Sequence, residues 1–172
     1  MKSRLYLLRH AKSSWEDPDL GDAERPLAPR GERAARRVAG HLREQGVKPD
    51  LVLCSPARRA RETLEAVAPA FGSGTEVRVE DDLYGAGAGE LLARLRQVSP
   101  GIRSVMVVGH NPGIHDLALE LVGAGEETAL AHLRHKFPTA ALATLTVAGW
   151  PELDRGRAQL DAFVVPRALA QP

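Results

Sequence analysis

Near its amino-terminal end the chain reads Leu5-Tyr6-Leu7-Leu8-Arg9-His10. Four consecutive apolar residues predict a buried strand, and the arginine and the histidine stand where that strand ends. A strand of a parallel sheet delivers the residues that follow it to the crevice at the carboxyl edge of the sheet. A guanidinium binds phosphate oxygens bidentately, and a neutral imidazole offers a nitrogen lone pair. We therefore expect Arg9 and His10 to form part of a phosphate site, against the simpler interpretation of two polar residues at a surface strand end.

A later apolar run repeats this pattern. Residues 104–109, which read Ser-Val-Met-Val-Val-Gly, predict a strand that leads into His110-Asn111-Pro112. Asn111 and Pro112 are typical of a helix N-cap and a first helical residue, and the helix is expected to continue through Leu117 to Gly123. His110 thus takes the same strand-end position as His10, which favours a shared catalytic role over a structural one.

Between these two strands, residues 50–54 form another apolar run, which ends in Ser55-Pro56. We interpret Ser55 as an N-cap and Pro56 as the first residue of a helix whose early turns carry Arg58, Arg59 and Arg61. Cations oppose the macrodipole at a helix N-terminus, whereas a bound anion is stabilised there. On a helical wheel with Leu64 in the core, Arg58 points to solvent and Arg59 lies nearer the strand end, so Arg59 is the candidate phosphate ligand.

Two further groups of residues suggest other chemistry. Cys54 suggests a thiolate phosphatase, a class in which an arginine follows the cysteine at a fixed spacing. Here the position that the arginine would occupy is Ala60. Cys54 is therefore predicted to be a buried strand residue. Asp81 and Asp82 follow a short predicted strand at 76–80, and either carboxyl group is a candidate proton donor if it reaches the crevice.

The remaining sequence completes an alternating α/β pattern. Helices are expected over 29–45, 90–97 and within 124–133, and late strands over 140–147 and 159–165. The first of these helices carries a basic face, for which a solvated surface is the favoured interpretation and nucleic-acid contact the alternative. That face consists of Arg33, Arg36, Arg37 and Arg43.

Composition limits the number of domains, the kinds of partner and the compartment that can be expected. The 172 residues, 44% hydrophobic and 26% charged, predict a single domain spanning 1–172 with a substantial core. A net charge of +1 gives no general field that would attract nucleic acid or membranes. Cys54 is the only cysteine, which excludes an internal disulfide. No run has the length of a signal peptide core or a membrane span, so a cytoplasmic location is expected.

Taken together, these motifs resemble the histidine phosphatase superfamily, in particular its short SixA-like branch of phosphohistidine phosphatases. The resemblance rests on segments in family order, namely 8–15 (Leu-Arg-His-Ala-Lys-Ser-Ser-Trp), 25–27 (Arg-Pro-Leu) with Gly31, 54–63, 83–85 (Leu-Tyr-Gly) and 108–113 (Val-Gly-His-Asn-Pro-Gly). It implies an α/β fold of the phosphoglycerate mutase type, a three-layer α/β/α sandwich around a mainly parallel sheet. It further implies that His10 becomes phosphorylated, that Arg9, Arg59 and His110 bind the phosphoryl group together with Asn111, and that no metal or cofactor takes part.

The resemblance also bears on the substrate. Larger members of the superfamily carry a glutamate that protonates an alkoxide leaving group, and no glutamate here matches it. A phosphohistidine leaves as weakly basic imidazole, which has less need of such an acid. The expected activity is therefore metal-independent hydrolysis of phosphohistidine on a partner protein. The alternatives are a phosphomonoesterase of small phosphorylated substrates that uses Asp81 or Asp82 as acid, and a non-catalytic phosphate-binding module.

Overall fold

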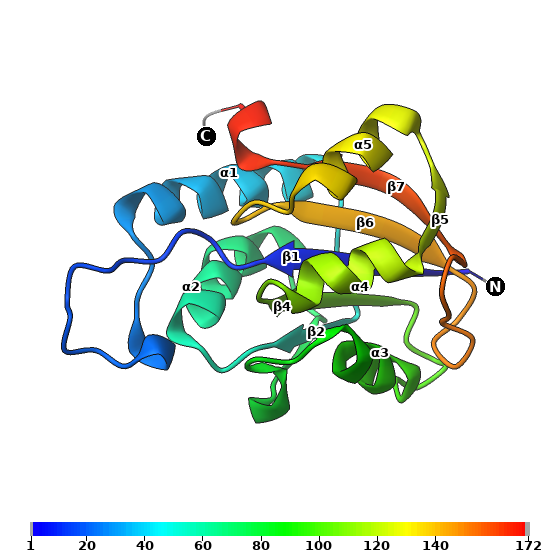
Figure 1. Ribbon diagram of the computed structural model, residues 1–172, viewed down its shortest axis with the longest axis horizontal. Helices are drawn as coiled ribbons and strands as arrows, with labels where there is room; N and C mark the ends of the chain where they lie inside the picture. Colours follow the sequence, from blue (N-terminus) through cyan, green and yellow to red (C-terminus); the bar gives the residue numbers. More distant parts are fainter. Residues whose placement is uncertain (1, 171–172) are drawn as a thin grey trace.

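The central sheet is organised around β1 (Ser3–Arg9) in a computed structural model that describes residues 2–170. On one side β1 pairs in parallel with β4 (Ser104–Gly109), and on the other it pairs antiparallel with β6 (Leu142–Val147). The sheet has seven strands within the described residues, in the order β3-β2-β4-β1-β6-β7-β5 (Figure 1). The strand that ends in Arg9 thus lies at the middle of the sheet.

The sheet is mainly parallel, as predicted. β2 (Leu51–Cys54) pairs in parallel with both β4 and β3 (Glu76–Val79). Across the sheet, β7 (Ala158–Val164) pairs antiparallel with β6 and in parallel with β5 (Val122–Gly125). β6 is accordingly the strand that runs against the others.

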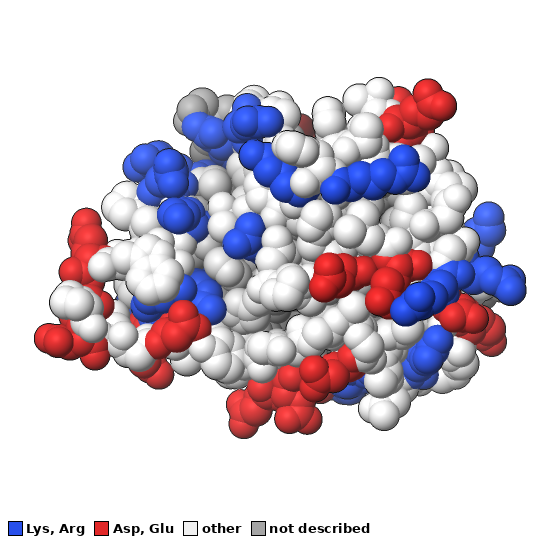
Figure 2. Space-filling model, viewed as in Figure 1, with Lys and Arg blue, Asp and Glu red and all other residues white. Residues whose placement is uncertain are grey.

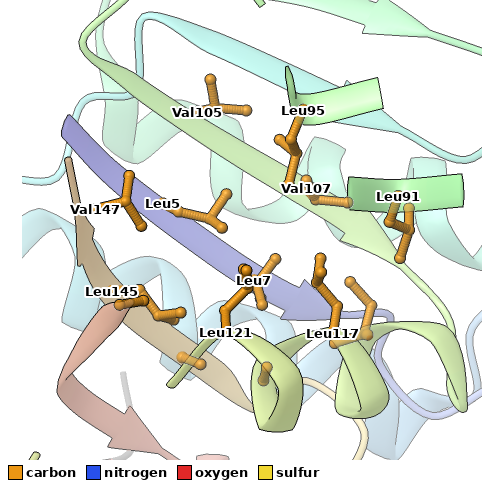
Figure 3. Packing of buried hydrophobic residues seen from close by; sticks show 14 of the residues in the cluster. Leu5, Leu7, Leu91, Leu95, Val105, Val107, Leu117, Leu121, Leu145 and Val147 are labelled. Carbon is orange, nitrogen blue, oxygen red and sulfur yellow. The ribbon is translucent and has the colours of Figure 1, made fainter. Parts of the chain in front are cut away.

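Helices cover both faces of the sheet, which confirms the three-layer α/β/α prediction (Figure 1). Alternate residues of β1 serve the two faces because successive side chains of a strand point in opposite directions. Tyr6 and Leu8 pack with α1 (Pro29–Glu44) and α2 (Arg58–Val67). Leu5 and Leu7 pack on the other face with α3 (Ala88–Arg96), α4 (Gly113–Leu121) and α5 (Glu127–His135), as Figure 3 shows for part of that core.

Short 3₁₀ helices occur in the connections, η1 (Asp22–Glu24), η2 (Ala68–Phe71), η3 (Asp81–Leu83) and η4 (Pro166–Ala168). No helix among residues 2–170 is both long enough and apolar enough to cross a membrane.

Three local predictions are wrong. Asn111 and Pro112 are not the N-cap and first residue of α4, because the helix begins at Gly113 with Pro112 as its cap. The helix expected to reach Gly123 ends at Leu121, and the next four residues form the edge strand β5. Close packing holds them there, since a Cβ on Gly123 would lie 1.9 Å from the carbonyl oxygen of Gly156. Ser55 is also not the N-cap of α2, because the helix begins at Arg58 with Ala57 as its cap. The Ser55 hydroxyl accepts a hydrogen bond from the Ala57 N–H at 3.2 Å instead, and is free to serve the site.

The carboxyl ends of β1, β2 and β4 lie side by side. Arg9 is in register with Gly109, and Cys54 is in register with Val108. His10 and His110 therefore leave the sheet at one edge, together with the segment that leads into α2.

Candidate active site

A cavity of about 510 Å³ opens at this carboxyl edge. The four residues expected to carry the catalysis line it, namely Arg9, His10, Arg59 and His110. They come from β1, α2 and β4 or from the residues directly after these strands. The imidazole rings of His10 and His110 have centroids 5.1 Å apart. The structure therefore brings together residues that are up to 101 positions apart in the chain.

His10 is held in one tautomer. Its Nδ1 lies 2.7 Å from the carbonyl oxygen of Ala11, which can only accept, so Nδ1 carries the proton. Nε2 then keeps the lone pair and has no hydrogen-bond partner among residues 2–170. Burial, assisted by the charges of His110, Arg59 and Arg9 and opposed by the Ala11 hydrogen bond, lowers the pKa of His10 to about 3. The imidazole is therefore neutral at physiological pH, as a nucleophile requires.

His110 is tied to β2 and α2. Its Nε2 lies 2.7 Å from Ser55 Oγ, and its Nδ1 lies 3.4 Å from Nη2 of Arg59. A guanidinium only donates, so Nδ1 accepts here and the proton of Nε2 is donated to Ser55. Burial, followed by the positive charge of Arg59, lowers the pKa of His110 to about 4. Ser55 thus fixes the His110 ring beside His10.

Two guanidinium groups converge on the same cavity. Arg9 donates from Nη1 to the carbonyl oxygen of Phe137 at 3.0 Å. The Nε atoms of Arg9 and Arg59 are both buried, and neither has a hydrogen-bond partner within the described chain. Burial and the nearby Arg59 charge lower the pKa of Arg9. Arg59 is buried and Arg9 is half-buried, and two such neighbouring like charges with unused Nε donors are stabilised by an anion. This geometry fits a phosphate dianion.

Asp22 is a site residue that sequence reasoning missed. Its carboxylate accepts from Nη2 of Arg59 at 3.0 Å, from Arg25 at 3.0 Å, and from the hydroxyl of Tyr84. Chiefly the Tyr84 hydrogen bond, and then those from Arg25 and Arg59, lower its pKa far below the ordinary value of an aspartate. Asp22 therefore orients Arg59 and stays ionised. The sequence gives one indication of this role, namely that Asp22 lies in the acidic loop that precedes Arg25-Pro26-Leu27.

Arg25 closes the rim of the cavity. Its guanidinium stacks over the Trp15 ring, with 3.6 Å between Cζ and the ring centroid, and it donates to Ser13 Oγ at 2.5 Å. Trp15 is 70% exposed, so a large aromatic surface stands at the entrance. The 13–15 segment is held against the 22–27 segment by these contacts and by the bridge between Ser13 and Leu27.

The other predicted residues lie differently. Asn111 lines the cavity, but its amide donates to the Phe137 carbonyl at 2.9 Å and its oxygen accepts from the His115 N–H. This geometry favours a role in positioning the Phe137 carbonyl, which also binds Arg9. Asp81 and Asp82 line a neighbouring depression and are absent from the lining of the His10 cavity.

Cys54 is excluded as a nucleophile. The residue is fully buried in β2, as predicted, and burial raises the pKa of its thiol to about 12. Only a thiolate attacks phosphorus efficiently, so this cysteine is inert. Among residues 2–170 there is also no group of three His, Cys, Asp or Glu side chains arranged to hold a metal ion.

Comparison with known proteins agrees with this geometry. The family model described as histidine phosphatase superfamily (branch 1) matches residues 5–97. An uncharacterized protein of Mycobacterium tuberculosis is 40% identical over 163 residues, which cover 93% of this chain and all of the relative. The phosphohistidine phosphatase SixA of Escherichia coli is 30% identical over 146 residues, 84% of this chain and 85% of that protein.

A solved structure from Nakamurella multipartitia, assigned as a phosphohistidine phosphatase SixA, superposes with a TM-score of 0.81. Its sequence is 33% identical, and the match covers 96% of this chain and 97% of that one. The three-layer fold is thus shared along nearly the whole of both chains.

Proposed function

The chain belongs to the histidine phosphatase superfamily, and we propose that it hydrolyses phosphohistidine on protein substrates through a phosphohistidine intermediate on its own His10. The observation that carries the proposal is the state of His10. The ring is neutral, its Nδ1 proton is tied to the Ala11 carbonyl, and its Nε2 lone pair stands beside two arginines. This is the arrangement that in-line attack on phosphorus requires.

The first step transfers the phosphoryl group to the enzyme. Arg9 and Arg59 bind the equatorial oxygens, and His10 Nε2 forms the new N–P bond. The electron pair of the breaking N–P bond returns to the substrate ring, which carries a proton on its other nitrogen and therefore leaves as neutral imidazole. His110 lies beside this centre with Nε2 on Ser55. His110 can donate to a phosphoryl oxygen after it exchanges its tautomer through solvent: Nε2 gives its proton to water and accepts the Ser55 O–H, while Nδ1 takes a proton from water and donates it to the oxygen.

The second step releases the phosphate. Water attacks the phosphorus of phosphorylated His10, the N–P bond breaks, and His10 returns to its neutral form with inorganic phosphate as product. The same arginines stabilise both steps because the same equatorial oxygens carry the charge each time.

The leaving group decides between substrate classes. Asp22 is the carboxylate that lines the cavity, and its pKa is held far too low for it to protonate an alkoxide. Asp81 and Asp82 lie outside the lining. An imidazole leaving group needs no such acid because its basicity is low. The similarity to the E. coli phosphohistidine phosphatase supports the same substrate class.

The test compares leaving groups and traps the intermediate. We expect kcat/KM for a phosphohistidine peptide to exceed the values for a phosphoserine peptide and a sugar phosphate by orders of magnitude. Enzyme quenched during turnover should carry one alkali-stable, acid-labile phosphate on the peptide that contains His10. His10→Ala should carry none and lose activity by several orders of magnitude, whereas His110→Ala should be slow but still label.

Two results would refute the proposal. Efficient hydrolysis of the sugar phosphate with slow hydrolysis of the phosphohistidine peptide would favour the small-molecule phosphomonoesterase. A label that survives in His10→Ala, or that maps to Ser55 or Cys54, would mean a different nucleophile.

A further inference from the structure

A second cavity, of about 500 Å³, adjoins the catalytic one. Lys12 and Thr139 line both cavities, so the two are neighbours across these side chains. We call the second cavity the basic groove. Its cationic residues are Lys12, Arg30, Arg33, Arg37, Lys136 and Arg167, and no aspartate or glutamate lines it.

The cations come together from four parts of the chain, of which the segment after β1 supplies Lys12. Arg30, Arg33 and Arg37 lie on one face of α1, because residues three and four apart on a helix are neighbours. Lys136 and Arg167 come from the segments after α5 and β7. Figure 2 shows the blue side chains gathered over α1 and the C-terminal segment, while the acidic side chains lie elsewhere on this face.

These cations lack acidic partners in the described part of the chain. None of the six takes part in an ion pair among residues 2–170, whereas Arg58 and Arg94 elsewhere pair with Glu62 and Glu80. The Nε atom of Arg37 is buried without a hydrogen-bond partner. Arg30 and Arg33 also stand in the first turns of α1, where the macrodipole is positive. A ligand with several negative charges would offset this local repulsion.

The walls between the cations indicate what kind of anion fits. Ala34, Pro138 and Val165 line the groove between the charged groups, so apolar surface alternates with positive charge. A compact polyphosphate would leave that apolar surface in water. A polypeptide in which acidic and apolar side chains alternate covers both kinds of surface at once.

We propose that the basic groove binds an acidic segment of the protein whose phosphohistidine enters the catalytic cavity. This inference rests on the function proposed above and assigns to it a substrate class, namely phosphoproteins with acidic residues beside the phosphorylated histidine. Attraction between opposite charges raises the association rate and is screened by salt. The preference is therefore expected in kcat/KM and is expected to weaken as ionic strength rises.

The test uses three phosphohistidine peptides of equal length, in which residues flanking the histidine alternate leucine with Glu, Gln or Lys. Phosphoramidate serves as a fourth substrate that is too small to reach the groove. For the wild type at low salt, we expect kcat/KM for the Glu peptide to exceed that for the Gln peptide by about 10-fold or more. The Arg33→Glu/Arg37→Glu variant should lose this preference and favour the Lys peptide, while it hydrolyses phosphoramidate at the wild-type rate.

Arg36→Glu is the matched control, because Arg36 is an exposed arginine of the same helix and does not line the groove. It should keep the preference for the Glu peptide. Three outcomes overturn the proposal: a preference that survives in the double variant, an equal loss in Arg36→Glu, or a parallel loss of phosphoramidate hydrolysis, which would place the effect in the catalytic cavity or the fold.

A binding measurement separates this proposal from the proposed function. A fluorescent, unphosphorylated Glu–Leu peptide should bind the wild type and not the double variant in fluorescence anisotropy. If no phosphohistidine peptide is hydrolysed but this binding persists, the proposed function fails and the groove stands as an acidic-peptide site. If tripolyphosphate binds and the peptide does not, the groove takes small polyanions and the proposal is wrong.

Discussion

Replacing Gly31 with alanine should damage the active site from a position that touches no substrate. Gly31 lies in the first turn of α1, where a Cβ would stand 2.1 Å from the carbonyl oxygen of Lys12. The two must separate by about 1 Å before the contact is tolerable. The Lys12 carbonyl also accepts a hydrogen bond from the Ala28 N–H at 2.9 Å. Lys12 directly follows Ala11, and the Ala11 carbonyl fixes the tautomer of His10.

The expected size of the effect follows from this shift. Overpacking of this kind costs about 1–3 kcal/mol, and a displacement of about 1 Å at catalytic groups costs about 100-fold in rate. We therefore expect Gly31→Ala to lower the melting temperature by several degrees and to lower kcat by about 10- to 100-fold, as measured by calorimetry and steady-state hydrolysis of phosphoramidate.

Gly40→Ala is the control for this variant. Gly40 lies in the same helix, and a Cβ there would meet nothing within 4 Å. Since alanine is the better helix former, Gly40→Ala should raise stability by about 0.5–1 kcal/mol and leave kcat unchanged. If Gly31→Ala proved as stable and as active as Gly40→Ala, the argument that α1 sets the position of the loop after β1 would be refuted.

Other predictions follow from the site. In the free protein, the His10 ring signals in NMR should titrate near pH 3, and a midpoint near 6.5 would contradict the neutral, buried nucleophile. Ser55→Ala should lower kcat by about 10-fold or more with little change in KM, because it frees the His110 ring, and a change confined to KM would argue against a positioning role. Asp81→Asn and Asp82→Asn should leave phosphohistidine hydrolysis nearly unchanged. A collapse of the hydrolysis rate in either variant would show that the replaced aspartate is the proton donor. Exhaustive dialysis against EDTA should leave activity intact, and a loss that Zn²⁺ or Mg²⁺ restores would show that a metal takes part.

The residues that could be predicted from the sequence are those whose environment is set locally. β1 and β4 are buried on both faces, so their continuous apolar runs reveal them and also place His10 and His110 at the strand ends. The position of Arg59 near the strand end could be predicted from the helical wheel of α2, because one face of that helix must pack against the core.

The features that escaped prediction depend on contacts between distant segments. Asp22 gains its role from Arg59 and Tyr84, which are 37 and 62 positions away, and no local pattern encodes those partners. β5 has the sequence Val-Gly-Ala-Gly, which carries no strand pattern, and exists because it pairs with β7. The basic face of α1 was predicted as solvated surface; only the approach of Lys136 and Arg167 makes part of it a groove.

The convergence of Arg9 and Arg59 carries an electrostatic cost that connects stability with function. The pKa values of His10 and His110, about 3 and about 4 in the folded protein, lie below the unfolded value of about 6.5, chiefly because both rings are buried and secondarily because of the arginine charges. Between these values the unfolded chain binds more protons, so stability is complete above about pH 6.5 and is lost as the pH falls toward 4 and then 3. A phosphoryl group between the arginines adds negative charge, raises both histidine pKa values and removes the repulsion. The cationic groups around His10 and His110 thus weaken the fold in acid. Their interactions strengthen as negative charge develops on the transferring phosphoryl oxygens, and this is how a transition state is stabilised.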